Sequence, residues 1–233
     1  MSRKTKRNRT EPEPPVPQDR RGIVVGSVVV LLLVFLAATL LYRKETAQSS
    51  QPAGSASLAA LASEHSPTLG DASAKVHIVE FLDPACETCA LFFPLVKQLM
   101  AENPNRIRLS IRHVAFHDGS DYAVKVLEAS RKQDKYLPTL EALLASQAQW
   151  APHHTVQPDL VLQAISGVGL NVEQLRVDMN SPEVAQRMEQ DRNDAVALKV
   201  TATPEYFVNG RPMPSFGLQQ LQTLVSEALQ SAY

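Results

Sequence analysis

The sequence contains very little cysteine: only Cys86 and Cys89 occur in 233 residues, and two residues separate them. Two cysteines cannot form a disulfide framework, and they supply only half of the ligands of a four-ligand zinc site. No internal repeat is visible, so the sequence does not indicate a repeat architecture. Any thiol chemistry must therefore run through this one pair, whose spacing on a helical turn lets the two sulfur atoms form and break a bond.

The chain also lacks a strong net charge, with 23 Lys and Arg against 24 Asp and Glu and a formal net charge of −1. The charge is unevenly distributed, because residues 1–22 hold seven basic and three acidic side chains, a net charge of +4. The remainder is mildly acidic and gives no indication of a nucleic-acid partner. Residues 11–17 are rich in proline and typical of disorder. We expect residues 1–22 to be a basic, proline-rich cytoplasmic tail.

One long uncharged run, Ile23 to Tyr42, follows this tail. As a helix it would be roughly 30 Å long, about the thickness of a bilayer core. Basic residues precede it, and only Arg43 and Lys44 follow before a long stretch without positive charge, so the positive-inside rule leaves the N-terminus in the cytoplasm. A cleaved signal peptide is the competing interpretation, but its apolar region is typically shorter and ends in small residues. The pattern favours an uncleaved transmembrane anchor over residues 23–42.

Residues 43–64 are rich in Ser, Ala and Gln and contain Pro52 and Gly54, a composition typical of a flexible linker. A short oligomerising helix around Leu58 to Leu61 is an alternative. Residues 65–233 are numerous enough for one domain with a sizeable core. The sequence therefore predicts a single domain tethered to the membrane by this linker.

The stretch from Val76 to Leu82 is rich in β-branched residues and apolar on both faces, which predicts a central strand covered on both sides. Glu80 is conspicuous within it. A turn signal, Asp83-Pro84-Ala85-Cys86, comes next, and an apolar helical pattern follows.

The cysteine pair thus lies where a strand ends and a helix begins. Free backbone N–H groups at a helix N-terminus stabilise an anion, so they favour the thiolate of Cys86, the attacking species in disulfide exchange. We expect Cys86 to be the exposed nucleophile and Cys89, one turn deeper, to be the resolving thiol.

These residues resemble the thioredoxin superfamily and, more closely, the bacterial periplasmic DsbA-like branch. The resemblance rests on the leader at residues 65–70, the strand at residues 76–81, the Cys86 to Cys89 pair, and Pro94 within the following helix. It implies an α/β thioredoxin-like fold over residues 65–233, with an inserted helical subdomain at about residues 118–200. In this family a buried acid on the strand before the cysteines assists proton transfer at the deeper one, and Glu80 matches its position.

A second matching block covers residues 200–210 and contains Thr203-Pro204. It resembles the family segment in which a cis-proline opens a strand beside the cysteines and the neighbouring backbone pairs with substrate. Asn209-Gly210 is a favourable two-residue hairpin turn. Further patterns predict strands at 107–114 and 211–213 and helices at 122–144, 158–168, 172–179, 182–198 and 218–232.

The chain departs from DsbA between the cysteines, where DsbA has Pro-His and this chain has Glu87-Thr88. A carboxylate beside Cys86 opposes its ionisation, so we expect a higher pKa and a less oxidising disulfide than in DsbA. Thr203 before the proline also resembles isomerase and reductase relatives more than the oxidase. The direction of electron flow stays open.

The resemblance implies a membrane-tethered thiol-disulfide oxidoreductase of the bacterial inner membrane, with its catalytic domain in the periplasm. Its redox centre would be the Cys86–Cys89 disulfide, without another cofactor or a metal. Its partners would be cysteine-containing exported proteins and a DsbB-like or DsbD-like membrane protein. The alternative is a copper-handling module in which the two thiolates hold Cu(I). The scattered histidines are not expected at the site, and His153-His154 is interpreted as surface decoration.

Overall fold

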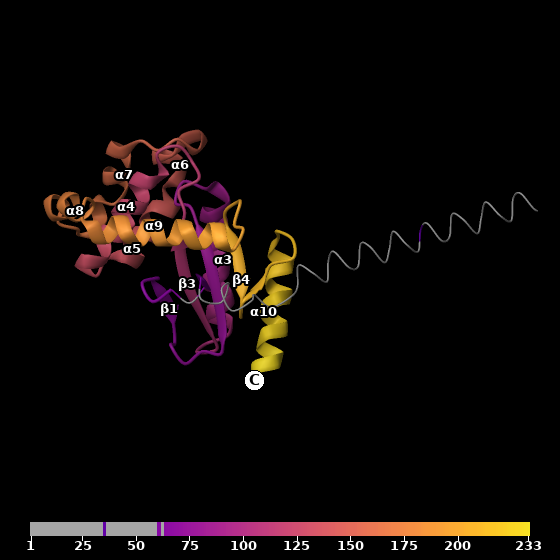
Figure 1. Cartoon of the computed structure of the whole chain (residues 1–233). Coiled ribbons are helices and arrows are strands. Elements are labelled where there is room, and N and C mark those ends of the chain that lie inside the picture. Colours follow the sequence, from indigo (N-terminus) through magenta and orange to yellow (C-terminus); the bar gives the residue numbers. More distant parts are fainter. Residues whose placement is uncertain (1–34, 36–59, 62) are drawn as a thin grey trace, which may run out of the picture. The chain divides into compact units, whose positions relative to one another are not determined.

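The computed structural model describes residues 35, 60–61 and 63–233 (Figure 1). The folded part belongs to one compact unit, Gln48–Tyr233. The anchor expected at residues 23–42 lies outside the described residues except for Phe35, as does most of the expected linker. No helix within the described part of the chain combines the length and apolar character needed to cross a membrane.

A five-stranded sheet forms the centre of the domain. Its spatial order is β1-β3-β2-β4-β5, in which β2 and β3 run parallel and the other neighbours are antiparallel. The strands are β1 (Thr68–Gly70), β2 (Val76–Leu82), β3 (Ile107–His113), β4 (Glu205–Val208) and β5 (Arg211–Pro212). The strand predicted to be central, β2, occupies the middle position and pairs with β3 on one side and β4 on the other.

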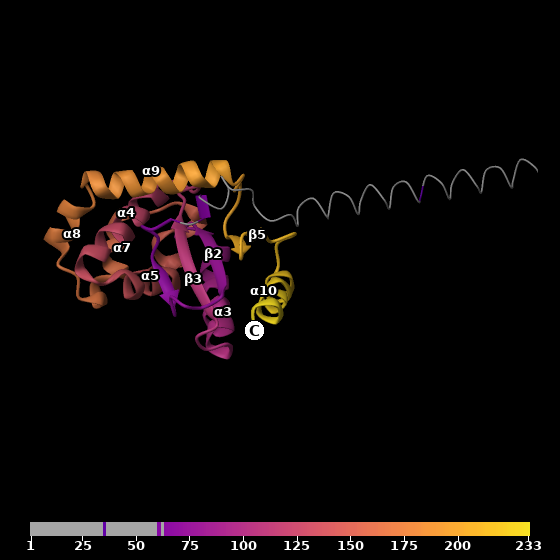
Figure 2. The same cartoon turned by 60° about the horizontal axis from the view of Figure 1, so that its bottom comes forward.

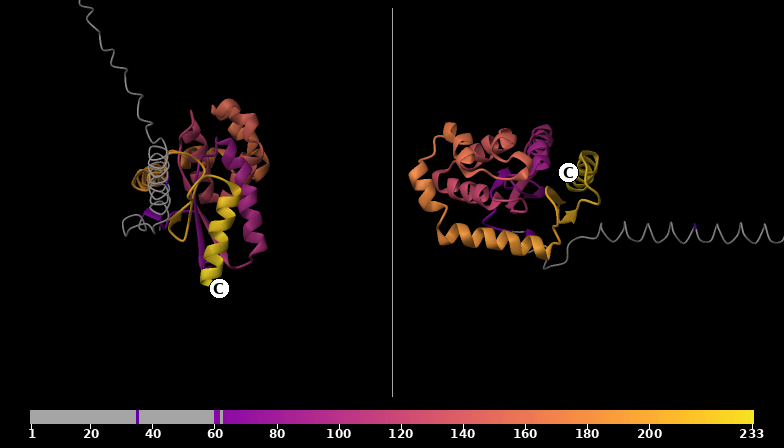
Figure 3. Two further views of the ribbon diagram at one scale, coloured as in Figure 1. Left: turned by 90° about the vertical axis from the view of Figure 1, so that its right-hand side faces the viewer. Right: turned by 90° about the horizontal axis from the view of Figure 1, so that it is seen from above.

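The alternation of side chains along β2 divides the core between the two faces of the sheet. Ile78 and Leu82 belong to the larger hydrophobic cluster, with buried residues of α3 (Glu87–Glu102) and α10 (Leu218–Ala232). Val79 and Phe81 belong to the smaller cluster on the other face, where α9 (Pro182–Ala197) packs. Figure 3 shows α9 on one side of the sheet and α3 and α10 on the other. Because both faces of β2 are buried, both carry apolar side chains.

The chain between β3 and β4 is mostly helical, and the helices before α9 lie at one end of the sheet (Figure 2). The helices of this segment are α4 (Ser120–Ser130), η1 (Arg131–Gln133), α5 (Tyr136–Ala145), α6 (Gln147–Trp150), η2 (Pro152–His154), α7 (Pro158–Ala164), η3 (Ser166–Val168), α8 (Val172–Asp178) and α9. The α/β thioredoxin-like fold with helical content is therefore confirmed.

The expected single helix over 122–144 is wrong, because the structure divides it into α4, η1 and α5. The chain turns at Asp134, whose φ of 53° is left-handed and cannot continue a helix. Aspartate tolerates this conformation better than most residues.

Helix α9 begins where the sequence pattern predicted. Ser181 caps it by accepting a hydrogen bond from the Val184 N–H, and Pro182 takes its first position.

The predicted hairpin between β4 and β5 is confirmed. Asn209 and Gly210 both have positive φ, 48° and 81°, as a type I′ turn requires. Asn209 also accepts a hydrogen bond on its side-chain oxygen from the His77 N–H, 2.7 Å away. The turn thereby ties the edge hairpin to the first residues of β2.

The packed domain begins earlier than residue 65. Ala60 and Leu61 are both buried, and Leu61 is part of the smaller core cluster. The end of the expected 43–64 linker is therefore wrong, because Leu61 within it packs against the sheet.

Candidate active site

The two cysteines lie at the N-terminus of α3, directly after the carboxyl end of β2. Cys86 is the N-cap residue of α3 and Cys89 occupies its first turn. Both are free thiols. The expectation that Cys86 is exposed is wrong: it retains 5% of its accessible surface, and Cys89 retains none. The sequence pattern places Cys86 at a helix start but carries no information about the loops that cover it.

The surroundings of Cys86 favour its thiolate. A hydrogen bond from the Cys89 thiol makes the largest contribution, and burial opposes it. The Thr203 side chain and the backbone N–H groups of Cys89 and Thr88 also stabilise the anion, so that the pKa of Cys86 falls from 9.0 to about 5. The amides belong to the first turn of α3 and point along the helix axis, as expected at a helix N-terminus.

Cys89 is shifted in the opposite direction. Burial raises the pKa of its thiol well above 9.0, and the hydrogen bond to Cys86 and the charge of Glu80 raise it further. The pair therefore holds one thiolate and one thiol at neutral pH. This division matches a nucleophile that is ready to attack and a partner that must first lose a proton.

Glu80 lies on β2 and is completely buried. Its Oε1 atom accepts a hydrogen bond from the Tyr206 hydroxyl at 3.0 Å, across the β2–β4 register, while Oε2 has no partner. Burial raises its pKa from 4.5 to about 8; the Tyr206 hydrogen bond works against this shift and the Cys86 charge adds to it. A buried carboxyl group with one open oxygen and a pKa near neutrality is suited to accept or release a proton.

Glu80→Gln is expected to stabilise the fold at neutral pH. Between pH 4.5 and about 8 the unfolded chain has lost the Glu80 proton that the folded chain keeps, so the free energy of unfolding falls as pH rises. The slope is at most about 1.4 kcal/mol per pH unit, which makes the variant more stable by up to about 3 kcal/mol at pH 7. Glutamine keeps an acceptor for Tyr206.

Urea unfolding, followed through the single, buried Trp150, measures this difference. The gain should disappear below about pH 4.5, where both states hold the proton. Glu87→Gln, which removes an exposed carboxylate, is the matched control and should not show the gain in stability at pH 7. Equal stability of wild type and Glu80→Gln at every pH would contradict the buried, protonated state.

Thr203 and Pro204 meet the cysteine pair from the segment before β4. The Thr203–Pro204 peptide bond is cis. In its thiol form, Cys86 donates a hydrogen bond from Sγ to the Thr203 carbonyl oxygen at 3.2 Å. Residues about 117 positions apart in the sequence therefore form one site.

Glu87 and Thr88, the residues predicted to tune the pair, occupy the first turn of α3. Glu87 is exposed and Thr88 is half-buried. Thr88 acts on Cys86 through its backbone N–H. The influence of the Glu87 carboxylate on Cys86 stays a prediction, and solvent around the exposed side chain weakens it.

Asp83 is a site residue that the sequence reasoning did not single out. It is fully buried, and its carboxylate accepts hydrogen bonds from the Ala85 N–H and from the loop before α4. The loop donors are the Phe116 and His117 N–H groups and His117 Nδ1, and the Ser120 hydroxyl donates from the first residue of α4, all at 2.7 to 3.1 Å. The turn signal Asp83-Pro84 was visible in the sequence, but the partners of the carboxylate were not.

His117 and His154 also reach the site, contrary to expectation. His117 contacts Asp83, and His154 donates from Nδ1 to the Ala85 carbonyl oxygen at 3.2 Å. Gln147 donates to the same oxygen. No periodicity or motif marks these three residues, because the insertion brings them to the cysteine pair only through its tertiary fold.

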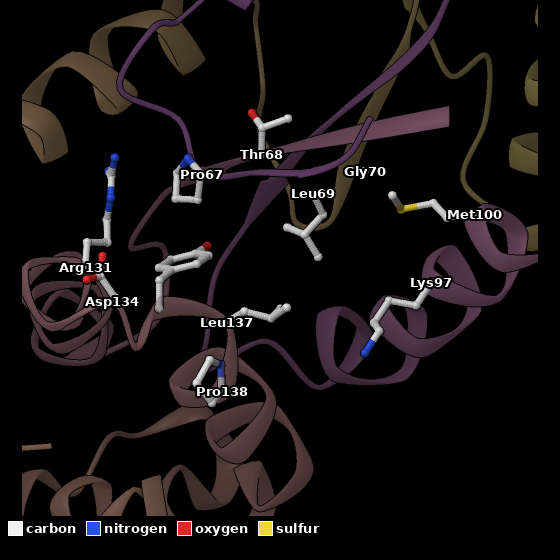
Figure 4. Close-up of a pocket in the computed structure, with 11 residues that line it drawn as sticks. Pro67, Thr68, Leu69, Gly70, Lys97, Met100, Arg131, Asp134, Leu137 and Pro138 are labelled. Carbon is white, nitrogen blue, oxygen red and sulfur yellow. The ribbon is translucent and has the colours of Figure 1, made fainter. Parts of the chain in front are cut away.

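The described residues contain no group of three or more His, Cys, Asp or Glu side chains arranged to hold a metal ion. A separate cavity of about 650 Å³ lies between β1, the second half of α3 and the start of α5. Figure 4 shows Leu69 and Leu137 there, with Lys97 and Arg131 to either side. Its lining does not include the cysteine pair or the residues that contact it.

Known proteins are similar to this chain in fold and in sequence. A family model described as thioredoxin matches residues 62–227, most of the chain. A solved thioredoxin-like oxidoreductase from Silicibacter pomeroyi DSS-3 is 32% identical, with a TM-score of 0.65, and the match covers 77% of this chain and all of that one. Wolbachia pipientis alpha-DsbA1 shares the fold at 18% identity, with a TM-score of 0.66 over 76% of this chain and 98% of that one.

Curated relatives of two kinds match the chain. The Na(+)/H(+) antiporter NhaA of Herminiimonas arsenicoxydans is 30% identical over 159 residues, 68% of this chain and 25% of the antiporter. The chain spans about a quarter to a third of the length of such antiporters. A putative protein-disulfide oxidoreductase of Rickettsia typhi is 24% identical over 168 residues, 70% of this chain and 61% of that protein. The chain therefore belongs to the thioredoxin family.

Proposed function

We propose that the protein is a membrane-tethered thiol-disulfide oxidoreductase that exchanges disulfides with exported proteins through Cys86 and Cys89. The observation that carries this proposal is the opposite shift of the two thiols, with the pKa of Cys86 lowered to about 5 and that of Cys89 raised well above 9.0. Structural cysteines buried in apolar surroundings do not acquire a low pKa. The oxidoreductase names of two relatives support the same reaction class.

The exchange runs through one mixed disulfide. In the reducing direction, the Cys86 thiolate attacks one sulfur of a substrate disulfide, the substrate S–S bond breaks, and the other substrate sulfur leaves as a thiolate. Cys89 then loses its proton and attacks the Cys86 sulfur, which releases the second substrate sulfur. The Cys86–Cys89 disulfide has formed and the substrate has gained two electrons. The oxidising direction is the reverse of these steps.

Glu80 is the residue that handles the proton of Cys89 in this proposal. With its pKa raised to about 8, Glu80 is ionised in a fraction of the molecules near neutral pH, and this carboxylate can accept the Cys89 proton and later return it. The unpartnered Oε2 leaves an oxygen free for this transfer. Thr203 and Pro204 would align the substrate backbone beside Cys86.

The Cys86 pKa predicts an intermediate redox poise. A value of about 5 lies between roughly 3.5 for DsbA and roughly 7 for thioredoxin. We expect titration of the thiolate absorbance to give a midpoint near 5. Equilibration with glutathione or dithiothreitol should give a reduction potential between about −120 and −270 mV. A thiolate midpoint at the ordinary value of a free cysteine would contradict the described environment.

The sequence pattern supports a proposed location, and the family resemblance supports proposed partners. The apolar run at residues 23–42 would hold the protein in the bacterial inner membrane, with the folded domain in the periplasm. Cysteine-containing exported proteins would be the substrates. A DsbB-like or DsbD-like membrane protein would restore the oxidised or the reduced pair, respectively.

The test compares disulfide exchange with copper binding by the full chain. Insulin reduction and reoxidation of a reduced, unfolded protein measure exchange in both directions, and competition for Cu(I) against a chelator measures the alternative. We expect turnover in at least one direction and no tight Cu(I) binding. Absence of exchange together with stoichiometric Cu(I) capture would replace the oxidoreductase with a copper-handling role.

A further inference from the structure

The helical insertion contacts the peptide group that immediately precedes the nucleophile. The Ala85 carbonyl oxygen accepts hydrogen bonds from Gln147 Nε2 and, at 3.2 Å, from His154 Nδ1. Ala85 is completely buried and Gln147 retains 4% of its surface. Because a carbonyl oxygen can only accept, Nδ1 of His154 must carry the hydrogen. Gln147 comes from α6 and His154 from η2, so two elements of the insertion meet at this one oxygen.

The same peptide group is held at its other end. The Cys86 N–H donates to the Asp83 carbonyl oxygen at 3.0 Å. The plane between Ala85 and Cys86 is therefore fixed by donors on its oxygen and an acceptor on its nitrogen. Rotation of this plane would break all three hydrogen bonds, and it would change the backbone angles of Cys86, now φ −81° and ψ 118° at the N-cap.

A second contact braces His154. Its ring stacks on that of His117, with centroids 4.7 Å apart and planes 24° from parallel. His117 is held in turn by Asp83, which accepts from His117 Nδ1 at 2.8 Å. Asp83 also receives the Ala85 N–H at 2.9 Å. The contacts form a closed loop from the end of β2, through the insertion, and back to the residue before Cys86.

We propose that Gln147 and His154 are positioning residues that hold the Cys86 sulfur over the N-terminus of α3 and thereby tune its redox poise. This inference rests on the proposed function and names the part of the insertion that controls the pair. The stabilisation of an anion by a helix N-terminus falls off within the first turn, so it depends on where the sulfur lies. Without its two donors the buried Ala85 oxygen would lack partners, and the peptide would move to find others.

Loss of this positioning should change the Cys86 pKa and the redox equilibrium in one definite direction. A less stabilised thiolate means a higher Cys86 pKa and a less stable reduced pair, so the disulfide becomes less oxidising. Gln147→Met removes the amide donor at similar volume. His154→Gly removes the ring at a position whose φ of 62° suits glycine. We expect the double variant to raise the Cys86 pKa by at least one unit and to shift the glutathione equilibrium constant at least tenfold toward the disulfide.

The chain offers matched controls on the same elements. Gln149→Met changes an exposed glutamine of α6, and His153→Gly changes the exposed histidine beside His154, which also has positive φ. Both should keep the wild-type thiolate titration and potential. His154→Asn should restore most of the wild-type values, because the amide nitrogen can take the place of Nδ1 and asparagine tolerates a left-handed conformation.

Trp150, which lies between Gln147 and His154 in the sequence, reports whether each variant is folded. A folded double variant with the thiolate titration of its controls would overturn the proposal. If the double variant does not fold, the single variants decide: the proposal requires His154→Gly to shift the titration and His154→Asn to restore it, and equal values refute it. The thiolate titration does not depend on turnover. A low Cys86 pKa without disulfide exchange would therefore reject the proposed function, while the effect of Gln147 and His154 on that pKa would still be measured.

Discussion

Cys86→Ser is expected to abolish thiol-disulfide exchange. The hydroxyl of serine does not ionise near neutral pH and cannot form a disulfide, so neither the attack on a substrate nor the mixed disulfide can occur. Cys89 cannot substitute for it, because it is fully buried and burial raises its pKa well above 9.0. Insulin reduction and the reoxidation of a reduced, unfolded protein should both fall to the rates measured without enzyme.

Cys89→Ser is expected to fail at the following step. The Cys86 thiolate still attacks, but no second thiol resolves the product, so a mixed disulfide between Cys86 and the substrate accumulates. The serine hydroxyl can still donate a hydrogen bond to Cys86, so the thiolate remains available for the first attack. Non-reducing electrophoresis and mass spectrometry detect the adduct. Wild-type insulin reduction in both serine variants would contradict a mechanism that runs through this pair.

Regular periodicity made much of the scaffold predictable. The bounds of α9 and α10 follow from apolar spacing, a Ser-Pro start and, for α10, the amphipathic run from Leu218 to Ala232. The central position of β2 follows from its two apolar faces. The cysteine pair could be named from its spacing and its place between a strand and a helix, whereas Glu80 and Thr203-Pro204 could be assigned only through the resemblance to a known family.

What the sequence could not predict depends on contacts between distant segments. Strand β1 has only three residues, Thr68–Gly70, too few to show alternation. Gln147 and His154 reach Ala85 from 62 and 69 residues away. The burial of Cys86 has the same origin, since it depends on which loops close over the end of the sheet. Local patterns thus located the nucleophile but not the groups that surround it.

A buried ionic network on the far face of the sheet is the clearest case of such a distant contact. Arg112 of β3 is fully buried and donates from Nε to Asp191 at 2.7 Å, from Nη2 to Asp194, and from Nη1 to the Ala60 carbonyl oxygen. Asp191 also accepts from His65 at 2.7 Å. Burial opposes ionisation of Asp191, but the His65 hydrogen bond and the Arg112 charge outweigh it and lower its pKa. The network joins β3, α9 and the segment that enters the domain.

Arg112→Met is expected to lower the free energy of unfolding by about 3 to 5 kcal/mol, because it leaves two buried carboxylates without their cation. This is a large part of the roughly 5 to 15 kcal/mol that stabilises a domain. Arg108→Met is the matched control: Arg108 lies on the same strand, makes no ion pair among the described residues, and should change stability by less than about 1 kcal/mol. Urea unfolding of the full chain, followed through Trp150, compares them. Equal losses in the two variants would show that α9 is held by apolar packing alone, whereas a selective loss at Arg112 would assign its position on the sheet to the buried charges.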